Sequence, residues 1–176
     1  FDKKIENISH HALFFDVDFN QHAKDIYDEP KWPDEPLFYA NFPSITDETA
    51  APKGMESGFF LIPLAPGIED TESLRNIYFE KIINRFEKIT NQSIKNNIIF
   101  MESFCKKDFE TSYNSYKGNA YGMANTLLQT AFLRPKLKSK KVKDLYFTGQ
   151  LTVPGPGVPP ALISGKLVSE LIEKNI

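Results

Sequence analysis

The sequence predicts an α+β fold, with a mostly antiparallel sheet and flanking helices. Three observations lead to this prediction. Short runs rich in aromatic and β-branched residues recur along the chain, each bounded by proline, glycine or polar residues. A single long pattern of apolar residues at helical spacing covers residues 71–90. Near the end, a β-prone run passes through a glycine- and proline-rich turn into a second helical pattern.

The order of the expected elements follows from these patterns. We expect strands at residues 11–17, 37–42, 58–64, 98–102 and 145–148. The run at 58–64 is almost continuously apolar, which is typical of a strand covered on both faces. Helices are expected at 71–90, where Asp70 or Thr71 can provide the N-cap, at 106–112, at 124–132, and from Pro159 onward. A short helical turn is expected near residues 23–27.

Composition narrows the class of protein. The chain has 176 residues, 41% hydrophobic and 25% charged, which suits one globular domain or a large piece of a longer protein. A net charge of −2 gives no reason to expect a nucleic-acid partner. The single Cys105 excludes an internal disulfide and a thiolate cluster, and it favours a reducing compartment. No apolar run approaches the roughly 18 residues of a membrane-spanning helix.

The histidines and the cysteine are candidates for chemistry. His10, His11 and His22 are the only histidines, and Asp16 follows His11 at opposite strand parity, so the two side chains should face opposite sides. We therefore expect no metal site, and we interpret His11 as a residue at the edge of the core or facing a substrate. Cys105 has lysines beside it, but we expect an inert, half-buried thiol.

The glycine-rich turn is the most specific local pattern. Gly149, Gly155 and Gly157 can adopt positive φ and allow a close approach to the backbone. Pro159 suits a first helical turn, where free N–H groups and the helix dipole favour an anion or an electron-rich carbonyl. A purely structural connection would need fewer glycines, so we favour a ligand site. Small residues continue on one helical face, at Ala161, Ser164, Gly165 and Val168.

Two other features suggest surfaces. Residues 136–143 carry the only charge run, which is first interpreted as a solvated loop and alternatively as a contact with anionic lipid headgroups. Aromatic residues make up 13% of the chain, with 15 phenylalanines. Much of this content suits a core, and some suits the wall of a cavity for a large apolar substrate.

Several ordered motifs resemble one family. The stretch from Tyr146 to Gly165, with Gly149, Pro154-Gly155-Pro-Gly157-Val-Pro159 and Ser164-Gly165, resembles the C-terminal flavin-binding signature of the bacterial-type phytoene (carotenoid) desaturases. These are FAD proteins of the amine-oxidase-like flavoprotein group. Further segments resemble the same family in the same order, at residues 9–15, 35–39, 43–47, 51–54, 118–122 and 129–135.

The resemblance implies a function. It implies non-covalent FAD, removal of hydrogen from a polyene precursor such as phytoene, and hydride transfer to the flavin. It implies a substrate-binding portion at residues 1–143 and an FAD-binding segment at 144–176, whose strand, loop and helix close the FAD site of a larger two-domain flavoprotein. The cofactor-binding residues that it implies are Gly149, Gln150, Gly155, Gly157, Val158 and Pro159. The substrate-binding residues that it implies are Tyr121, Gly122, Gln129 and Arg134.

Departures from the family limit what this chain does alone. The family's G-x-G-x-x-G motif is absent, so we expect the catalytic residues to lie in an N-terminal part outside this chain. We also expect this chain alone to be inactive and to bind FAD weakly or not at all. Residues 150–153 and Pro156 also differ from the family pattern. We further expect a cytoplasmic protein with peripheral contact to the cytoplasmic membrane. Alternatives are a carotenoid isomerase, a retinoid saturase, an amine oxidase, or a non-enzymatic module that binds lipid or a partner.

Overall fold

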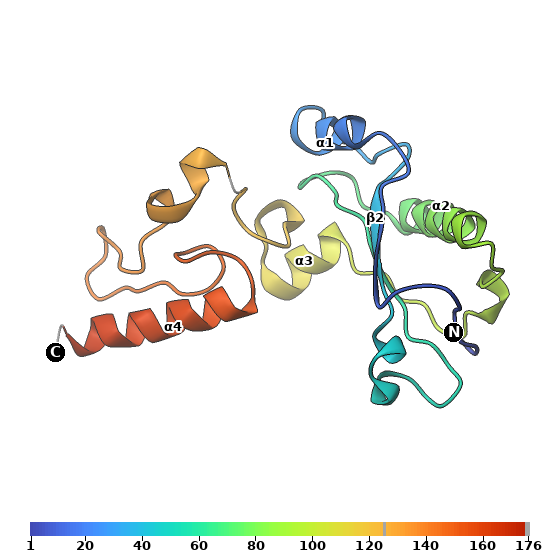
Figure 1. Cartoon of the computed structure of the whole chain (residues 1–176). Helices are drawn as coiled ribbons and strands as arrows, with labels where there is room; N and C mark the ends of the chain where they lie inside the picture. The colour runs from blue at the N-terminus through green and yellow to red at the C-terminus, as the bar shows by residue number, and fades with distance from the viewer. Residues whose placement is uncertain (125, 175–176) are drawn as a thin grey trace. The chain divides into compact units, whose positions relative to one another are not determined.

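The chain divides into two compact units, Phe1–Tyr113 and Asn114–Ile176 (Figure 1). The structure, a computed structural model, describes residues 1–124 and 126–174. The boundary between the units lies before the functional division drawn from the sequence between residues 143 and 144, and that division stays a prediction. The two units are described separately below.

A three-stranded antiparallel sheet forms the first unit, with strands β1 (His11–Phe14), β2 (Phe38–Asn41) and β3 (Phe59–Leu61) in chain order. In its register His11 lies opposite Asn41, and Asn41 lies opposite Phe59. The antiparallel α+β prediction is therefore confirmed, and each strand is shorter than its predicted run. The described residues contain three strands rather than the five expected.

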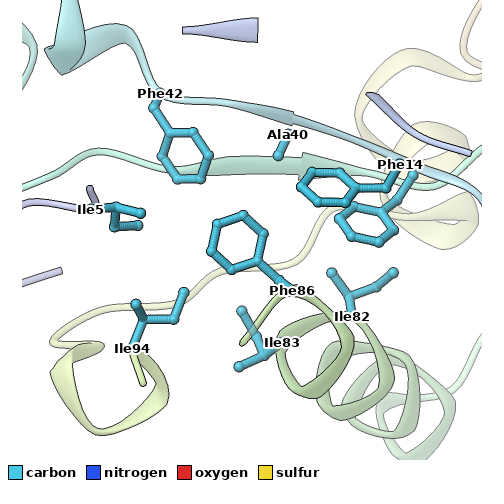
Figure 2. Packing of buried hydrophobic residues seen from close by; sticks show 9 residues of the cluster. Ile5, Phe14, Ala40, Phe42, Ile82, Ile83, Phe86 and Ile94 are labelled. Atoms are coloured by element: carbon cyan, nitrogen blue, oxygen red, sulfur yellow. The ribbon is translucent and has the colours of Figure 1, made fainter. Parts of the chain in front are cut away.

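Helix α2 (Glu72–Thr90) covers one face of this sheet. Its N-cap is Thr71, whose hydroxyl accepts a hydrogen bond from the Leu74 amide, and its C-cap Asn91 adopts the left-handed conformation. The helix predicted at 71–90 is confirmed, with Thr71 rather than Asp70 as its cap. Figure 2 shows Ile82, Ile83 and Phe86 of α2 facing the side chains of the sheet.

The core beneath α2 is built mainly from aromatic rings. Phe86 is fully buried and lies edge-on to Phe60, with 5.5 Å between the ring centroids. The Phe14 and Phe38 rings, paired across β1 and β2, stack at 4.3 Å. Phe42 closes the cluster at 5.7 Å from Phe86 (Figure 2). Because side chains alternate along a strand, the residues between these lie on the opposite face of the sheet.

Two shorter helices complete the first unit. Helix α1 (Phe19–Tyr27) is longer than the predicted turn because Asp18 caps it by accepting from the Asn20 amide. His22 on α1 is buried, its Nδ1 accepting from the Leu37 amide at 2.9 Å while Nε2 donates to the Pro63 carbonyl at 2.8 Å. This pattern fixes the neutral Nε2–H tautomer. Helix α3 (Lys106–Tyr113) agrees with its prediction.

The second unit consists of 3₁₀ turns, a hairpin, the glycine-rich loop and helix α4 (Val158–Glu173). Helix α4 begins one residue before the predicted Pro159. The hairpin is held by hydrogen bonds from the Ser139 amide to the Leu145 carbonyl and from the Phe147 amide to the Leu137 carbonyl.

Several predicted elements were wrong. Residues 98–102 form no strand, and the side chains of Ile99 and Phe100 are exposed, because no described strand pairs with them. The segment 124–132 forms 3₁₀ turns at Leu127–Gln129 and Ala131–Leu133 instead of an α-helix, with residue 125 outside the described residues. The run at 145–148 contributes one isolated bridge, between Lys138 and Tyr146. Strand β3 is not covered on both faces, since Phe59 is 54% exposed.

Candidate functional site

The glycine-rich loop at residues 149–157 joins the hairpin to α4. Gly149, Gly155 and Gly157 have φ values of 99°, 138° and 110°. Residues with a side chain rarely adopt these conformations, so the backbone itself requires glycine at the three positions. A Cβ atom at Gly149 would meet nothing within 4 Å, which leaves the backbone accessible there. The prediction that these glycines provide positive φ is confirmed.

Ser164 fastens the beginning of the loop to α4. Its side chain is fully buried, and its Oγ lies 2.7 Å from the Gly149 amide, 2.7 Å from the Thr148 hydroxyl and 2.6 Å from the Ala161 carbonyl. The only consistent assignment has Ser164 donating to Ala161 and accepting from Gly149 and Thr148, which uses the full hydrogen-bonding capacity of a hydroxyl. This role was missed in the sequence, where Ser164 was noted only as a small residue on a narrow face.

Arg134 organises the middle of the loop. It is 2% exposed, and its guanidinium donates to the carbonyls of Gln150 at 2.8 Å, Thr152 at 3.2 Å and Gln129 at 3.3 Å. A planar fork of donors suits several acceptors fixed at once. The Cβ position at Gly155 lies 3.7 Å from the guanidinium carbon, so the far side of the loop also approaches this group. Arg134 therefore holds both ends of a curved backbone segment.

Fixing these carbonyls also orients backbone amides. In a trans peptide the C=O and the N–H point to opposite sides of the chain. Because Gln150 and Thr152 turn their carbonyls toward Arg134, the N–H groups of Leu151 and Val153 point away from the guanidinium. Among the residues that the structure describes, neither amide donates a hydrogen bond. The outer surface of the loop thus offers donors for an acceptor outside it.

The start of α4 has fewer free amides than the sequence suggested. Pro159 and Pro160 have no N–H group, and the Ala161 amide bonds the Gly157 carbonyl at 3.0 Å. The amides of Gly157 and Val158 have no acceptor within the described part of the chain. Two donors at the positive end of a 16-residue helix remain, and they suit a negative or partly negative oxygen.

The structure brings most of the predicted substrate residues to this same loop. Gly122, with φ of 81°, lies so close to Leu151 that a Cβ atom would come within 2.5 Å of its Cδ2. Gln129 takes part through its backbone carbonyl and Arg134 through its guanidinium. Tyr121 is 64% exposed, and no contact brings its ring to the loop. Gly122 and Arg134 therefore contact the loop, and Gln129 is joined to it through Arg134.

A polar cluster lies on the face of the sheet opposite α2 in the first unit. His11 Nδ1 is 2.6 Å from the Tyr39 hydroxyl and 3.0 Å from Asn41 Nδ2, which also donates to the His10 carbonyl. An amide nitrogen only donates, so His11 Nδ1 acts as the acceptor and its Nε2 carries the proton. Leu13 and Phe59 flank the cluster and are exposed. The interpretation of His11 as a substrate-facing residue stays a prediction.

Other candidate groups contribute less to a site. Burial raises the pKa of the Cys105 thiol, which agrees with the expectation of an inert cysteine. Within residues 1–124 and 126–174, no group of three histidine, cysteine, aspartate or glutamate side chains is arranged to hold a metal ion. None of the helices in the described part of the chain combines the length and hydrophobicity needed to span a bilayer.

Curated proteins named as carotenoid desaturases match nearly the whole chain. A carotenoid 3,4-desaturase of Haloarcula japonica is 42% identical over 172 residues, which is 98% of this chain and 35% of the relative. A 4,4′-diapophytoene desaturase of Staphylococcus haemolyticus is 36% identical, over 94% of this chain and 34% of the relative. One from Staphylococcus aureus is 32% identical, over the same shares.

These matches confirm the resemblance predicted from the motifs. The chain spans about a third of the length of the curated relatives it matches, which is consistent with a C-terminal portion of a carotenoid desaturase. No protein-family model matches the chain.

Proposed function

We propose that this chain is the C-terminal portion of an FAD-dependent desaturase that acts on phytoene or a related carotenoid precursor. The observation that carries the proposal is a glycine loop whose carbonyls face Arg134 and whose amides face outward, in a homologue of carotenoid desaturases. Such a loop offers hydrogen-bond donors and a close backbone approach, which is what a nucleotide cofactor requires. When bound, FAD would supply the hydride acceptor for an oxidation in which a proton is also lost from the adjacent carbon and a new C=C bond forms.

The residues have separable roles in this proposal. The outward face of the loop, from Gly149 and Gln150 to Gly155, would hold the ribityl and pyrophosphate part of FAD. Gly157, Val158 and Pro159 would meet the isoalloxazine ring, with the two free amides directed to a ring carbonyl. Arg134 is then a positioning residue, because it acts on the cofactor through the carbonyls of Gln150 and Thr152.

The substrate side is proposed from a different surface. The sheet face opposite α2 presents Leu13, Tyr39 and Phe59 around His11, and Leu13 and Phe59 are exposed. A mixed aromatic and aliphatic surface of this kind suits a long polyene. Within the second unit, Tyr121 and Gly122 are proposed separately as substrate contacts. Catalytic residues are proposed to lie outside this chain. We also propose that the isolated chain is inactive, and that the whole protein is cytoplasmic and associates peripherally with the cytoplasmic membrane.

The experiment uses the full-length protein, produced in a host that accumulates phytoene. New pigments with added double bonds would support the desaturase, and geometric isomers of unchanged mass would instead support a carotenoid isomerase. Unchanged phytoene would refute the proposed reaction. A purified protein that stays colourless after addition of FAD would refute the cofactor and favour a non-enzymatic module.

The loop geometry is tested with Arg134→Gln. Without the guanidinium, the loop carbonyls lose the donors that fix their orientation. We therefore expect the FAD content of the purified protein to fall about tenfold or more. Lys136→Gln removes a neighbouring exposed charge and should leave the FAD content unchanged. Melting curves of the FAD-free proteins would separate lost binding from lost folding. Equal FAD content in both variants would contradict the role of Arg134.

A further inference from the structure

A hairpin in the second unit gathers most of the positive charge of this part of the chain. Residues 136–147, called the lysine hairpin below, contain five lysines and a single aspartate, whereas the whole chain has a net charge of −2. Positive charge is thus concentrated in one hairpin of a molecule whose remaining residues are net negative. A solvated loop would need neither this concentration nor a fixed backbone.

The lysine hairpin has a defined shape. Its arms are joined by the two backbone hydrogen bonds described above and by the bridge between Lys138 and Tyr146, whose ring lies 5.3 Å from the lysine Nζ. Leu137 is buried and anchors the base. At the tip, the Ser139 hydroxyl accepts from the amides of Lys141 and Val142. The backbone of the tip is therefore held in one conformation by its own hydrogen bonds.

The tip combines exposed cations with an exposed apolar side chain. Lys140, Lys141 and Lys143 are exposed, and none of them forms an ion pair within the described part of the chain. Val142 lies among them and is 54% exposed, and Leu145 is 39% exposed. An apolar side chain with lysines next to it in the chain suits the lipid–water interface. There the ammonium groups can contact lipid headgroups while a short apolar group reaches the boundary of the acyl chains.

We propose that the lysine hairpin is the contact of this protein with a membrane surface rich in anionic lipids. Charge complementarity selects the partner, because each lysine near such a surface contributes attraction and the apolar tip adds a second, short-range term. The 3₁₀ turns that precede the lysine hairpin add further exposed apolar side chains in the same unit, namely Leu127, Leu128 and Phe132. The proposal locates the peripheral membrane contact included in the proposed function.

The lysine hairpin is directly connected in the chain to the glycine-rich loop. The second arm of the lysine hairpin continues directly through Thr148 into Gly149, whose amide is fastened to α4 by Ser164. A membrane-bound hairpin would therefore hold the neighbouring glycine loop near the lipid surface. That arrangement suits an enzyme whose substrate is dissolved in lipid.

The test measures co-sedimentation of the full chain with vesicles. We expect binding to vesicles of phosphatidylcholine with phosphatidylglycerol, weak binding to phosphatidylcholine alone, and loss of binding as salt is raised. The variant with Lys140→Ser, Lys141→Ser and Lys143→Ser should bind the anionic vesicles on the order of a hundredfold more weakly. A control with Lys3→Ser, Lys53→Ser and Lys88→Ser changes the net charge equally and should bind nearly as well as the unaltered chain.

The outcomes separate the proposal from its competitors. Equal binding by the two triple variants would overturn it, because the effect would then follow net charge alone. Val142→Ser should weaken vesicle binding severalfold without changing the charge. Unchanged binding by that variant, with hairpin-dependent capture by a soluble polyanion, would identify a polyanion contact instead of a membrane. Vesicle binding needs neither FAD nor polyene, so failure here leaves the proposed flavin site intact.

Discussion

Replacing Ser164 with alanine tests how the glycine loop is attached to α4. The change removes one hydroxyl that donates to the Ala161 carbonyl and accepts from Thr148 and Gly149. Thr148 is exposed and can turn its hydroxyl to water, whereas the Gly149 amide loses a 2.7 Å bond in a partly buried place. A donor left without a partner costs about 1–3 kcal/mol. The higher helix propensity of alanine stabilises the variant by about 0.5 kcal/mol, which offsets part of this cost.

The matched control is Ser169→Ala, at an exposed position on the same helix. It gains the same propensity and loses no buried bond, so the two variants should differ in free energy of unfolding by about 1–3 kcal/mol. Urea unfolding gives this difference. Amide hydrogen exchange at Gly149 gives the local effect, and we expect exchange in Ser164→Ala to be about tenfold faster or more. Equal stability and equal Gly149 protection in the two variants would refute the assigned role of Ser164.

Two further changes probe the loop and the first unit. Gly122→Ala forces a side chain onto a φ of 81° and within 2.5 Å of Leu151, so we expect a loss of about 2–4 kcal/mol in urea unfolding. Adding Leu151→Ala should recover the steric part, and no recovery would argue against the close approach. Asp70→Asn removes a buried partner of Arg75 and should cost about 3 kcal/mol near pH 7. The Arg75 guanidinium lowers the pKa of Asp70, so the unaltered chain should lose this stability as pH falls below about 4 and through the lowered pKa. The difference in free energy of unfolding between the unaltered chain and the variant should then close. A difference unchanged down to about pH 2 would contradict the assignment.

The parts of the fold that were predicted correctly have local causes. Helix α2 follows from an apolar stripe with a threonine cap at its start, and both signals lie within its own sequence. Polar or proline residues flank the sequence runs that form β1 and β2. The positions of these strands could therefore be predicted from the sequence, although their ends could not. The run at 98–102 has the same composition as these strands. It remains unpaired because strand formation depends on a partner, which composition does not encode.

The candidate site also has features that were predictable from local sequence and features that depend on the folded chain. The need for glycine at positions 149, 155 and 157 is a property of each residue's own backbone, and it was predictable from the sequence. Ser164 and Arg134 act across 15 and 18 residues of chain, on the Gly149 amide and the Thr152 carbonyl respectively. Only the folded backbone brings these atoms together. A signal was nevertheless present, because serine on a narrow apolar helix face needs a hydrogen-bond partner when that face is buried.

Arg134 explains how a loop so rich in glycine could serve as the proposed binding surface. Glycine lowers the steric barrier to the required backbone conformations but increases the conformational entropy lost on folding. A loop held by glycine alone would therefore meet a ligand as an ensemble and lose affinity through ordering. Arg134 and Ser164 order the loop before any ligand arrives, the first through carbonyls and the second through the Gly149 amide. Because each fixed carbonyl turns the following amide away from Arg134, the contacts that rigidify the loop would also create its proposed binding face.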